Sequence, residues 1–465
     1  MLKDLLKTIG DVIIDLFKQG EIWFVLFLAG FAGIFFFLPI TFQAAFWGFI
    51  KLTWWLWLFI FMWRLFLSTW LFWRQDIFQK GLGWQVWEIK IPRSNEKGAE
   101  AMEAILLSLH GLTNAAGDPK ERYWDGEITR TIALEMASFG GEVHFYLRGY
   151  GKVANLIEAN FHAHYPDLEL VQIEDYVHRL PQTLEEIYAQ GKDIYGGDLI
   201  LEKDPVIPLK TYLYFMNDPA EEKRVDPMGA FIELLSKLEP GELVAIQIVL
   251  EGARATWTEA AQKYIDEYKE KTSGRHSITT AAGTQTTINV RTPGETELLK
   301  DMEENIGKPV FNTMIRAVYI SKQEDFYDAY PRRAIKAAFN QYSGVNRNSF
   351  DWIEPQLTRA KIWYFPYVFP RLRVEFRKQR LLANYFERNL PWETFMGKLL
   401  TSHILNLNFH MKTSILNIEA IASLFHPPTD IVLTTPHIPR QESRRAGPQA
   451  GIPIFGDDAD IEKYQ

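Results

Sequence analysis

The sequence contains no cysteine among its 465 residues. Disulfide scaffolds, thiolate metal sites and cysteine nucleophiles are therefore excluded, and a reducing compartment is permitted. A positive net charge is also missing, because 50 Lys and Arg face 58 Asp and Glu, a balance of -8. This balance disfavours a globally basic nucleic-acid-binding protein, although it leaves room for a local basic patch.

A phosphate-binding loop is absent as well. The P-loop of ATPases needs Gly-x-x-x-x-Gly-Lys-Ser/Thr, because its backbone N–H groups cradle phosphate and its hydroxyl binds Mg²⁺. No Gly-Lys pair here is followed by Ser or Thr: Gly151-Lys152, Gly191-Lys192, Gly307-Lys308 and Gly397-Lys398. Zinc-protease and nucleophile-elbow motifs are missing too. The sequence indicates no catalytic residue, cofactor or metal site and favours a non-enzymatic protein; a hydrolase with an unrecognised site has no positive support.

Tryptophan is concentrated at one end of the chain, with ten of 15 Trp in the first 90 residues. The stretch 22–50 contains no charged residue, and about 20 apolar residues are enough to span a bilayer as a helix. Pro39 is expected to end or kink a helix. The pattern predicts a transmembrane helical hairpin within residues 21–80, with helices at 22–38 and about 45–66 and a turn near 39–43. A single span followed by an interfacial aromatic helix is the alternative.

Positive charges flank the predicted hairpin, and its turn has none. The positive-inside rule therefore places both termini and the bulk of the chain on the cytoplasmic side of the inner membrane. Residues 1–20 carry apolar side chains at helical spacing between Lys and Asp, which is typical of an amphipathic helix lying on a membrane or a partner. The lipid bilayer is thus the first expected partner.

The remainder of the chain is acidic and reads as an α+β protein. Residues 81–180 show the order strand, helix, strand, strand, helix, strand, with a Gly140-Gly141 turn between the middle strands. This is the ferredoxin-like βαββαβ arrangement. Glu135 and Glu142, which flank the turn, are expected to be solvated strand residues.

The same order is predicted again over residues 181–370. Its elements are a strand at 211–216, a helix capped by Asp226, a strand at 242–251, a strand at 311–321, a helix near 335–342 and a last strand around 362–364. A helical insertion near 254–308 interrupts this second ferredoxin-like unit, and 273–294 is expected to be a mobile loop. Whether the two units share a sheet or pack through helices stays open.

The C-terminal part is predicted to contain a helical segment, 371–426, and an extended or disordered Pro-rich tail, 427–465. Five cations in the helical segment form a candidate basic contact patch: Arg371, Arg373, Arg377, Lys378 and Arg380. Three interpretations apply to it. It is a solvated helix face, a contact with phospholipid or an acidic partner, or a nucleic-acid contact.

Three segments together resemble a known family. They are residues 126–177, the strand 311–321 and residues 417–453, which contain Leu424-Phe425-His426-Pro427, Thr435-Pro436 and Ser443-Arg444-Arg445. In this order they resemble the membrane-anchored N-terminal region of type IV secretion and conjugation ATPases of candidate-phyla (Patescibacteria) bacteria. The resemblance implies an anchor, two ferredoxin-like units and a Pro-rich stretch, followed in that family by the P-loop module.

The printed sequence ends at Gln465, about where that module would begin, so ATP hydrolysis is not carried over. The resemblance implies a membrane-anchored component of a secretion or conjugation machine that docks a separate ATPase. The alternative is a membrane-bound nucleic-acid-binding subunit of a DNA transfer or uptake system. Homo-oligomerisation stays open. The candidate partner-contact residues in the tail are Phe425, His426, Pro427, Ser443, Arg444 and Arg445.

Overall fold

The computed structural model describes residues 39–92, 95–111, 117–216, 225–253, 256–272, 274–279, 285–323, 330–360, 368–403, 408–430 and 432. The predicted amphipathic helix 1–20 and the predicted first span 22–38 lie outside the described residues. So does nearly all of the predicted tail beyond 430, and so does the strand expected at 362–364.

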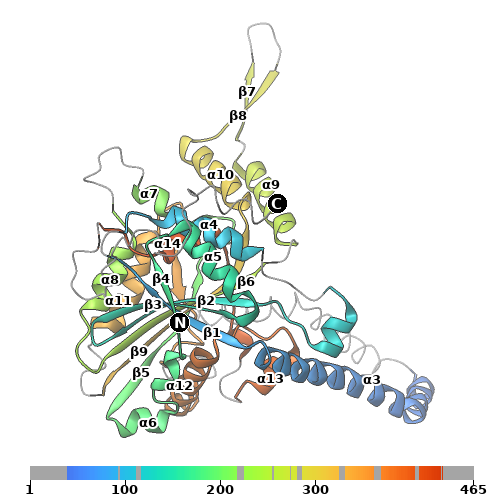
Figure 1. Ribbon diagram of the computed structural model, residues 1–465. Coiled ribbons are helices and arrows are strands. Elements are labelled where there is room, and N and C mark those ends of the chain that lie inside the picture. The colour runs from blue at the N-terminus through green and yellow to red at the C-terminus, as the bar shows by residue number, and fades with distance from the viewer. Residues whose placement is uncertain are drawn as a thin grey trace, which may run out of the picture.

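Helix α3 (Ile40–Lys80) is continuous over 41 residues and projects from the body of the molecule (Figure 1). The prediction of a turn at 39–43 is wrong, because residues from Ile40 onward are helical. The helix also continues well past residue 66, where the predicted second span ends. Pro39 immediately precedes it, a place where the fixed φ of proline is tolerated. Arg64 and Arg74 do not interrupt the helix, since arginine is a good helix former.

The body is built on one antiparallel sheet with the strand order β10-β5-β9-β6-β2-β3-β1-β4, and β11 also pairs with β9. Its strands are β1 (Trp84–Lys90), β2 (Thr131–Phe139), β3 (Glu142–Tyr150), β4 (Glu169–Ile173), β5 (Lys192–Leu201), β6 (Leu243–Gly252), β9 (Val310–Lys322), β10 (Phe350–Trp352) and β11 (Ser414–Asn417). The expected α+β class is therefore confirmed.

The sheet consists of two halves with the same connectivity. The first half follows β1, α4 (Ala99–His110), β2, β3, α5 (Ala154–His164) and β4, as the sequence predicts. The second follows β5, α8 (Met228–Ser236), β6, β9, α11 (Tyr330–Phe339) and β10. The strand order is β2-β3-β1-β4 in one half and β6-β9-β5-β10 in the other. The corresponding strands β2 and β6 pair antiparallel, so the halves share a single sheet.

Helices cover both faces of this sheet. α4, α5, α8, α11 and α14 (Ile418–Leu424) enclose the larger core on one face. α12 (Pro370–Glu387) and α6 (Leu184–Ala189) enclose a second core on the other. Strand side chains alternate between the two, as Val244 and Ile246 of β6 belong to the first core and Ala245 to the second. Burial on both faces explains why the central strand β6 is mostly apolar.

Two elements of the second half differ from expectation. The segment 211–216, predicted as a strand, contains the short helix α7 (Tyr212–Met216). A six-residue apolar run does not distinguish strand from helix by periodicity. The first strand of this half is instead β5. Its central Gly196-Gly197 pair argues against a strand when the sequence is considered alone, because glycine weakens strand interiors.

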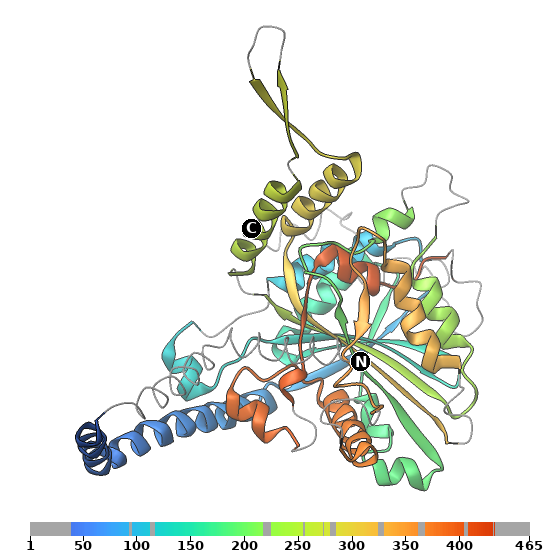
Figure 2. The same ribbon diagram turned by 180° about the vertical axis from the view of Figure 1, so that it is seen from behind.

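The insertion lies between β6 and β9, within the expected limits. It consists of α9 (Thr256–Thr272), the paired strands β7 (Gly274–Thr279) and β8 (Gln285–Val290), and α10 (Pro293–Ile306) (Figure 2). The expectation of an irregular loop at 273–294 is therefore wrong. The two helices pack on each other around Ile265 and Met302. After α12 the chain forms the short helix α13 (Phe395–Leu400) before β11 and α14.

Candidate functional site

The five predicted basic residues lie on α12 but do not form one surface. Arg373, Arg377 and Lys378 are buried, Arg380 is half-buried and Arg371 is exposed. Lys378 Nζ donates to Asp193 Oδ1 at 2.6 Å. Arg377 Nη1 donates to the carbonyl oxygens of Leu357 and Arg359 at 3.0 and 2.6 Å. The helix therefore directs most of this charge into the protein rather than toward a ligand.

Arg388, just after α12, connects this helix to the first half of the sheet. Its Nε donates to Glu135 Oε1 and its Nη2 to Asp175 Oδ1, both at 2.8 Å. Burial alone would lower the pKa of Arg388, but the charge of Glu135 and the hydrogen bonds to Asp175 and Glu135 outweigh burial and raise that pKa. Glu135 is only 1% exposed, so the expectation of a solvated Glu135 is wrong.

Side chains from the second half of the sheet donate hydrogen bonds to backbone carbonyl oxygens at the same end of α12. Arg316 Nη1 donates to Asn384 O at 2.7 Å, and Gln247 Nε2 donates to Tyr385 O at 2.9 Å. These carbonyls belong to the last turn of α12, where Asn384 O also accepts from the backbone N–H groups of Arg388 and Asn389. Arg316 is itself held by Asp198, with Nε and Oδ1 2.8 Å apart. The end of α12 is thus a buried structural junction.

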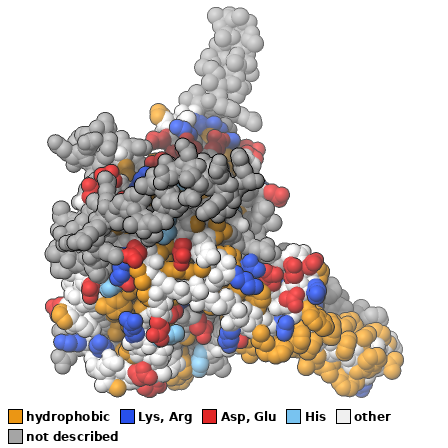
Figure 3. Space-filling view, viewed as in Figure 1, with side chains coloured by type: hydrophobic (Ala, Val, Ile, Leu, Met, Phe, Trp, Pro, Cys, Tyr) orange, Lys and Arg blue, Asp and Glu red, His pale blue; other side chains and the backbone are white. Residues whose placement is uncertain are grey.

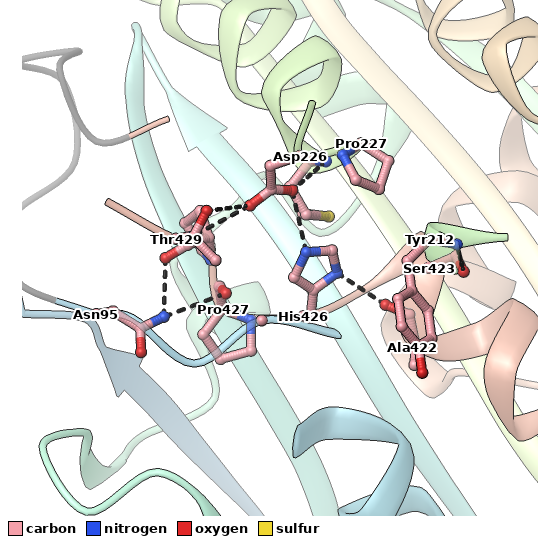
Figure 4. A network of polar contacts seen from close by, with 12 residues as sticks. Asn95, Tyr212, Asp226, Pro227, Ala422, Ser423, His426, Pro427 and Thr429 are labelled. Atoms are coloured by element: carbon pink, nitrogen blue, oxygen red, sulfur yellow. Dashed lines mark hydrogen bonds and ion pairs between the residues drawn. The ribbon is translucent and has the colours of Figure 1, made fainter. Parts of the chain in front are cut away.

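A second polar cluster lies on the opposite face, where the chain leaves α14 (Figure 4). Asp226 accepts from His426 Nε2 at 3.0 Å, from Thr429 N at 3.0 Å and from Met228 N at 2.8 Å. His426 Nδ1 donates to Ala422 O at 2.8 Å. Both ring nitrogens of His426 therefore have a hydrogen-bond partner, one on α14 and one at the start of α8.

Charge and hydrogen bonding control the ionisation of Asp226. Burial alone would raise the pKa of Asp226. The charge and hydrogen bond of His426, together with the N–H groups of Thr429 and Met228, outweigh burial and lower that pKa to about 2. Asp226 also accepts at the start of α8, as the predicted cap requires. The cluster therefore contains a buried carboxylate that is hydrogen-bonded to His426, Thr429 and Met228.

The same cluster fixes the residues that follow α14. Asn95 Nδ2 donates to Pro428 O at 2.9 Å, and Asp430 N donates to Asn95 O at 2.9 Å. We call residues 426–430 the strap, because they run between the β1–α4 connection and the start of α8. Phe425, His426 and Pro427, predicted as partner contacts, are buried here. Ser443, Arg444 and Arg445 lie outside the described residues.

Within the described part of the chain, helix α3 is seated on the body near its C-terminal end. Ser68 Oγ accepts from Met396 N at 3.1 Å, and Trp70 Nε1 donates to Tyr123 O at 2.8 Å. The rings of Phe72 and Trp392 meet edge to face with centroids 4.7 Å apart. Tyr123 belongs to η1 (Glu121–Asp125) and Met396 to α13, so two separate short helices hold α3.

Most of α3 before this seat is covered by nothing in the described part of the protein. Large apolar side chains are exposed along it from Trp47 to Phe66. Over Gln43–Lys80 the helix is long and apolar enough to cross a membrane, and only 6% of its most apolar stretch is buried. The space-filling view shows this arm as a continuous hydrophobic surface (Figure 3). The helix has the length and composition of a membrane-spanning segment.

A surface cavity of about 440 Å³ lies beside α10, α7 and β11. Its charged lining includes Asp301 and Arg347, whose Oδ2 and Nη2 are 2.6 Å apart, so these two charges neutralise each other. Among the residues that the structure describes, no three His, Asp or Glu side chains are gathered to hold a metal ion. The cavity offers no convergent catalytic set.

Fold and site together define an α+β protein that carries one long exposed apolar helix. The chain belongs to the family described as a domain of unknown function, DUF8128, whose model matches residues 76–348. The match starts in the last turns of α3 and covers the sheet from β1 to β9, but not β10, α12 or the strap. No curated protein matches the chain.

Proposed function

We propose that the protein is a non-enzymatic, membrane-anchored component that holds an α+β platform at the cytoplasmic face of the inner membrane. The observation that carries this proposal is α3, which is exposed and apolar over most of its length and seated firmly at its end. An exposed apolar surface of this size is unfavourable in water and favourable in lipid.

The platform is further proposed to contain two ferredoxin-like units. Six elements in the order strand, helix, strand, strand, helix, strand occur in each half, and the strand orders correspond. Antiparallel pairing of β2 with β6 makes one wide sheet from the two units. Such a duplicated sheet, with both faces covered by helices, supports a role as a rigid support rather than as an open catalytic cleft.

The partner is proposed to be a separate ATPase of a type IV secretion or conjugation-like machine, as the sequence resemblance implies. The strap supports this assignment because it fixes the beginning of the tail on the platform. Ser443, Arg444 and Arg445 are the proposed contact residues. The alternative, nucleic-acid binding through α12, is weaker because Arg373, Arg377 and Lys378 are buried.

The test uses the full chain in its native membranes. We expect the tagged protein to remain in the membrane fraction after alkaline washing, and cross-linking with mass spectrometry to identify a P-loop ATPase beside it. Replacing Ser443, Arg444 and Arg445 with Ala should remove that cross-link, whereas Arg371→Ala should not. Release by alkaline washing contradicts the anchor, and cross-links without an ATPase contradict the docking role.

A further inference from the structure

Two short helices that hold α3 present apolar side chains to solvent. We call these side chains the collar: Tyr123 and Trp124 of η1, and Phe395, Leu399 and Leu400 of α13. Trp124 is 68% exposed and Leu400 54% exposed. The same helices touch α3, since the rings of Trp124 and Trp70 are in contact and the backbone N–H of Met396 donates to Ser68 Oγ. Both short helices are therefore held against α3 while the collar side chains stay exposed.

The collar lies just beyond the stretch of α3 that fits a bilayer. About 20 helical residues cross the hydrocarbon core, which is roughly 30 Å thick. The stretch from Trp47 to Phe66 has this length, and its two cations, Lys51 and Arg64, lie near its ends where long side chains reach the headgroups. The collar meets α3 at Ser68 to Arg74, within two turns of Phe66.

The amino-acid composition of the collar and of α3 from Ser68 to Arg74 is typical of protein at the boundary between lipid and water. Trp and Tyr concentrate there, because one side of the ring is apolar and the other carries a polar group. Trp70, Trp73, Tyr123 and Trp124 meet this description. The charges of the two short helices balance, with Arg122 and Lys398 against Glu121 and Asp125, so the match to the interface rests on the aromatic side chains.

The exposed apolar surface of the collar is also continuous with that of the proposed membrane span. Phe66 and Trp73 of α3 are about half exposed on either side of the contacts with the two short helices, so exposed apolar side chains continue from the span to the collar. A partner that covers the exposed part of α3 therefore reaches the collar as well. Lipid covers α3 in the proposed function, and the same lipid is then in position to cover η1 and α13.

We infer that the collar is embedded in the interfacial layer of the bilayer, where it fixes the depth and tilt of the platform. Its occupant is lipid, at the level of the headgroups and first methylenes. The inference rests on the proposed membrane anchor and goes beyond it, because it makes two helices of the platform itself part of the membrane contact. A tether through α3 alone would leave the platform free to tilt.

The absence of cysteine allows a direct test with single cysteines in the full-length protein. We would replace Trp124 or Leu400 of the collar, Leu56 of the span, or Leu156 of α5 with Cys, and label each with an environment-sensitive fluorophore. Leu156 is the matched control, since it is 45% exposed on α5, a platform helix that is not one of the two helices of the collar. The labelled proteins are reconstituted in phosphatidylcholine–phosphatidylglycerol vesicles, with or without lipids that carry a nitroxide quencher near the headgroup.

We expect blue-shifted emission and quenching by the nitroxide lipids at positions 124 and 400, and neither effect at position 156. Position 56 should be blue-shifted and quenched better by a nitroxide deep in the acyl chain. Water-like emission at 124 and 400 with a lipid-like signal at 56 overturns the collar but leaves the anchor intact. A water-like signal at 56 overturns the anchor itself. Blue-shifted but unquenched probes at 124 and 400 show a protein cover and also overturn the inference.

Discussion

Glu135 and Gln247 face each other at the centre of the β2–β6 pair, and both are buried. The strands correspond in the two halves, so an approximate two-fold axis between these residues would exchange them. Both side chains nevertheless contact the same asymmetric element. Glu135 accepts from Arg388, and Gln247 donates to Tyr385 O. The end of α12 is therefore bound where the two halves meet, and it ties them together.

Replacing Arg388 with Met should destabilise the platform strongly. The change leaves the buried carboxylate of Glu135 and the half-buried carboxylate of Asp175 without their cation. Breaking one side of a buried ion pair typically costs about 3–5 kcal/mol. Urea unfolding of the detergent-solubilised full chain would measure this loss. The control, Arg371→Met on the same helix, changes an exposed residue and should stay within about 0.5 kcal/mol. Equal effects of the two substitutions would contradict the junction.

Asp226 should contribute a stability that disappears in acid. Its pKa is about 2 in the folded protein, below the ordinary 3.8, so the carboxylate stabilises the fold above pH 4. That contribution is lost as the pH falls through the folded pKa and amounts to about 2 kcal/mol. The difference in unfolding free energy between the native chain and Asp226→Asn should therefore shrink between about pH 5 and pH 2. Asp430→Asn, at an exposed neighbour, should show no such trend.

Gly126 should be indispensable for seating η1 on α3. Its φ is 72°, and a Cβ there would lie 2.4 Å from the carbonyl carbon and oxygen of Arg74. Gly126→Ala should therefore raise hydrogen exchange over residues 117–130 by well over tenfold. Gly83→Ala is the matched control, because φ is 62° and no atom lies within 4 Å of the added Cβ. It should cost only about 1 kcal/mol of backbone strain. Unchanged exchange in Gly126→Ala would show that η1 does not need this contact.

Local patterns predicted much of the fold but little of the polar chemistry. The apolar spacing that identified the buried stripe of α8, from Met228 to Leu238, depends only on neighbouring residues. The burial of Glu135 depends on Arg388, 253 positions away, and no local signal announces that a helix will cover that face of the sheet. His426 was singled out as a partner contact by resemblance, whereas its actual partner, Asp226, was identified as a helix cap. Sequence patterns identify each of the two residues but cannot predict their contact, because 200 positions separate them.

The position of β5 in the sheet, which the sequence did not predict, can be tested at its glycines. They are required by close packing against neighbouring elements rather than by a turn. The φ of Gly196 is 154°, and a Cβ there would lie 2.0 Å from Ala317 O on β9 and 3.1 Å from Leu381 on α12. Neither the strand nor the helix behind it has room for a methyl group. Gly196→Ala should therefore prevent stable pairing of β5 with β9 and leave little folded protein after purification.

The comparison that isolates this packing effect is Gly191→Ala, just before β5. There φ is 67° and no atom lies within 4 Å of an added Cβ, so only the local backbone strain of about 1 kcal/mol applies. Circular dichroism and urea unfolding of both variants give the readout. A folded Gly196→Ala protein with the stability of Gly191→Ala would mean that β5 does not lie between β10 and β9. In that case the second half would lose the strand order that makes it match the first.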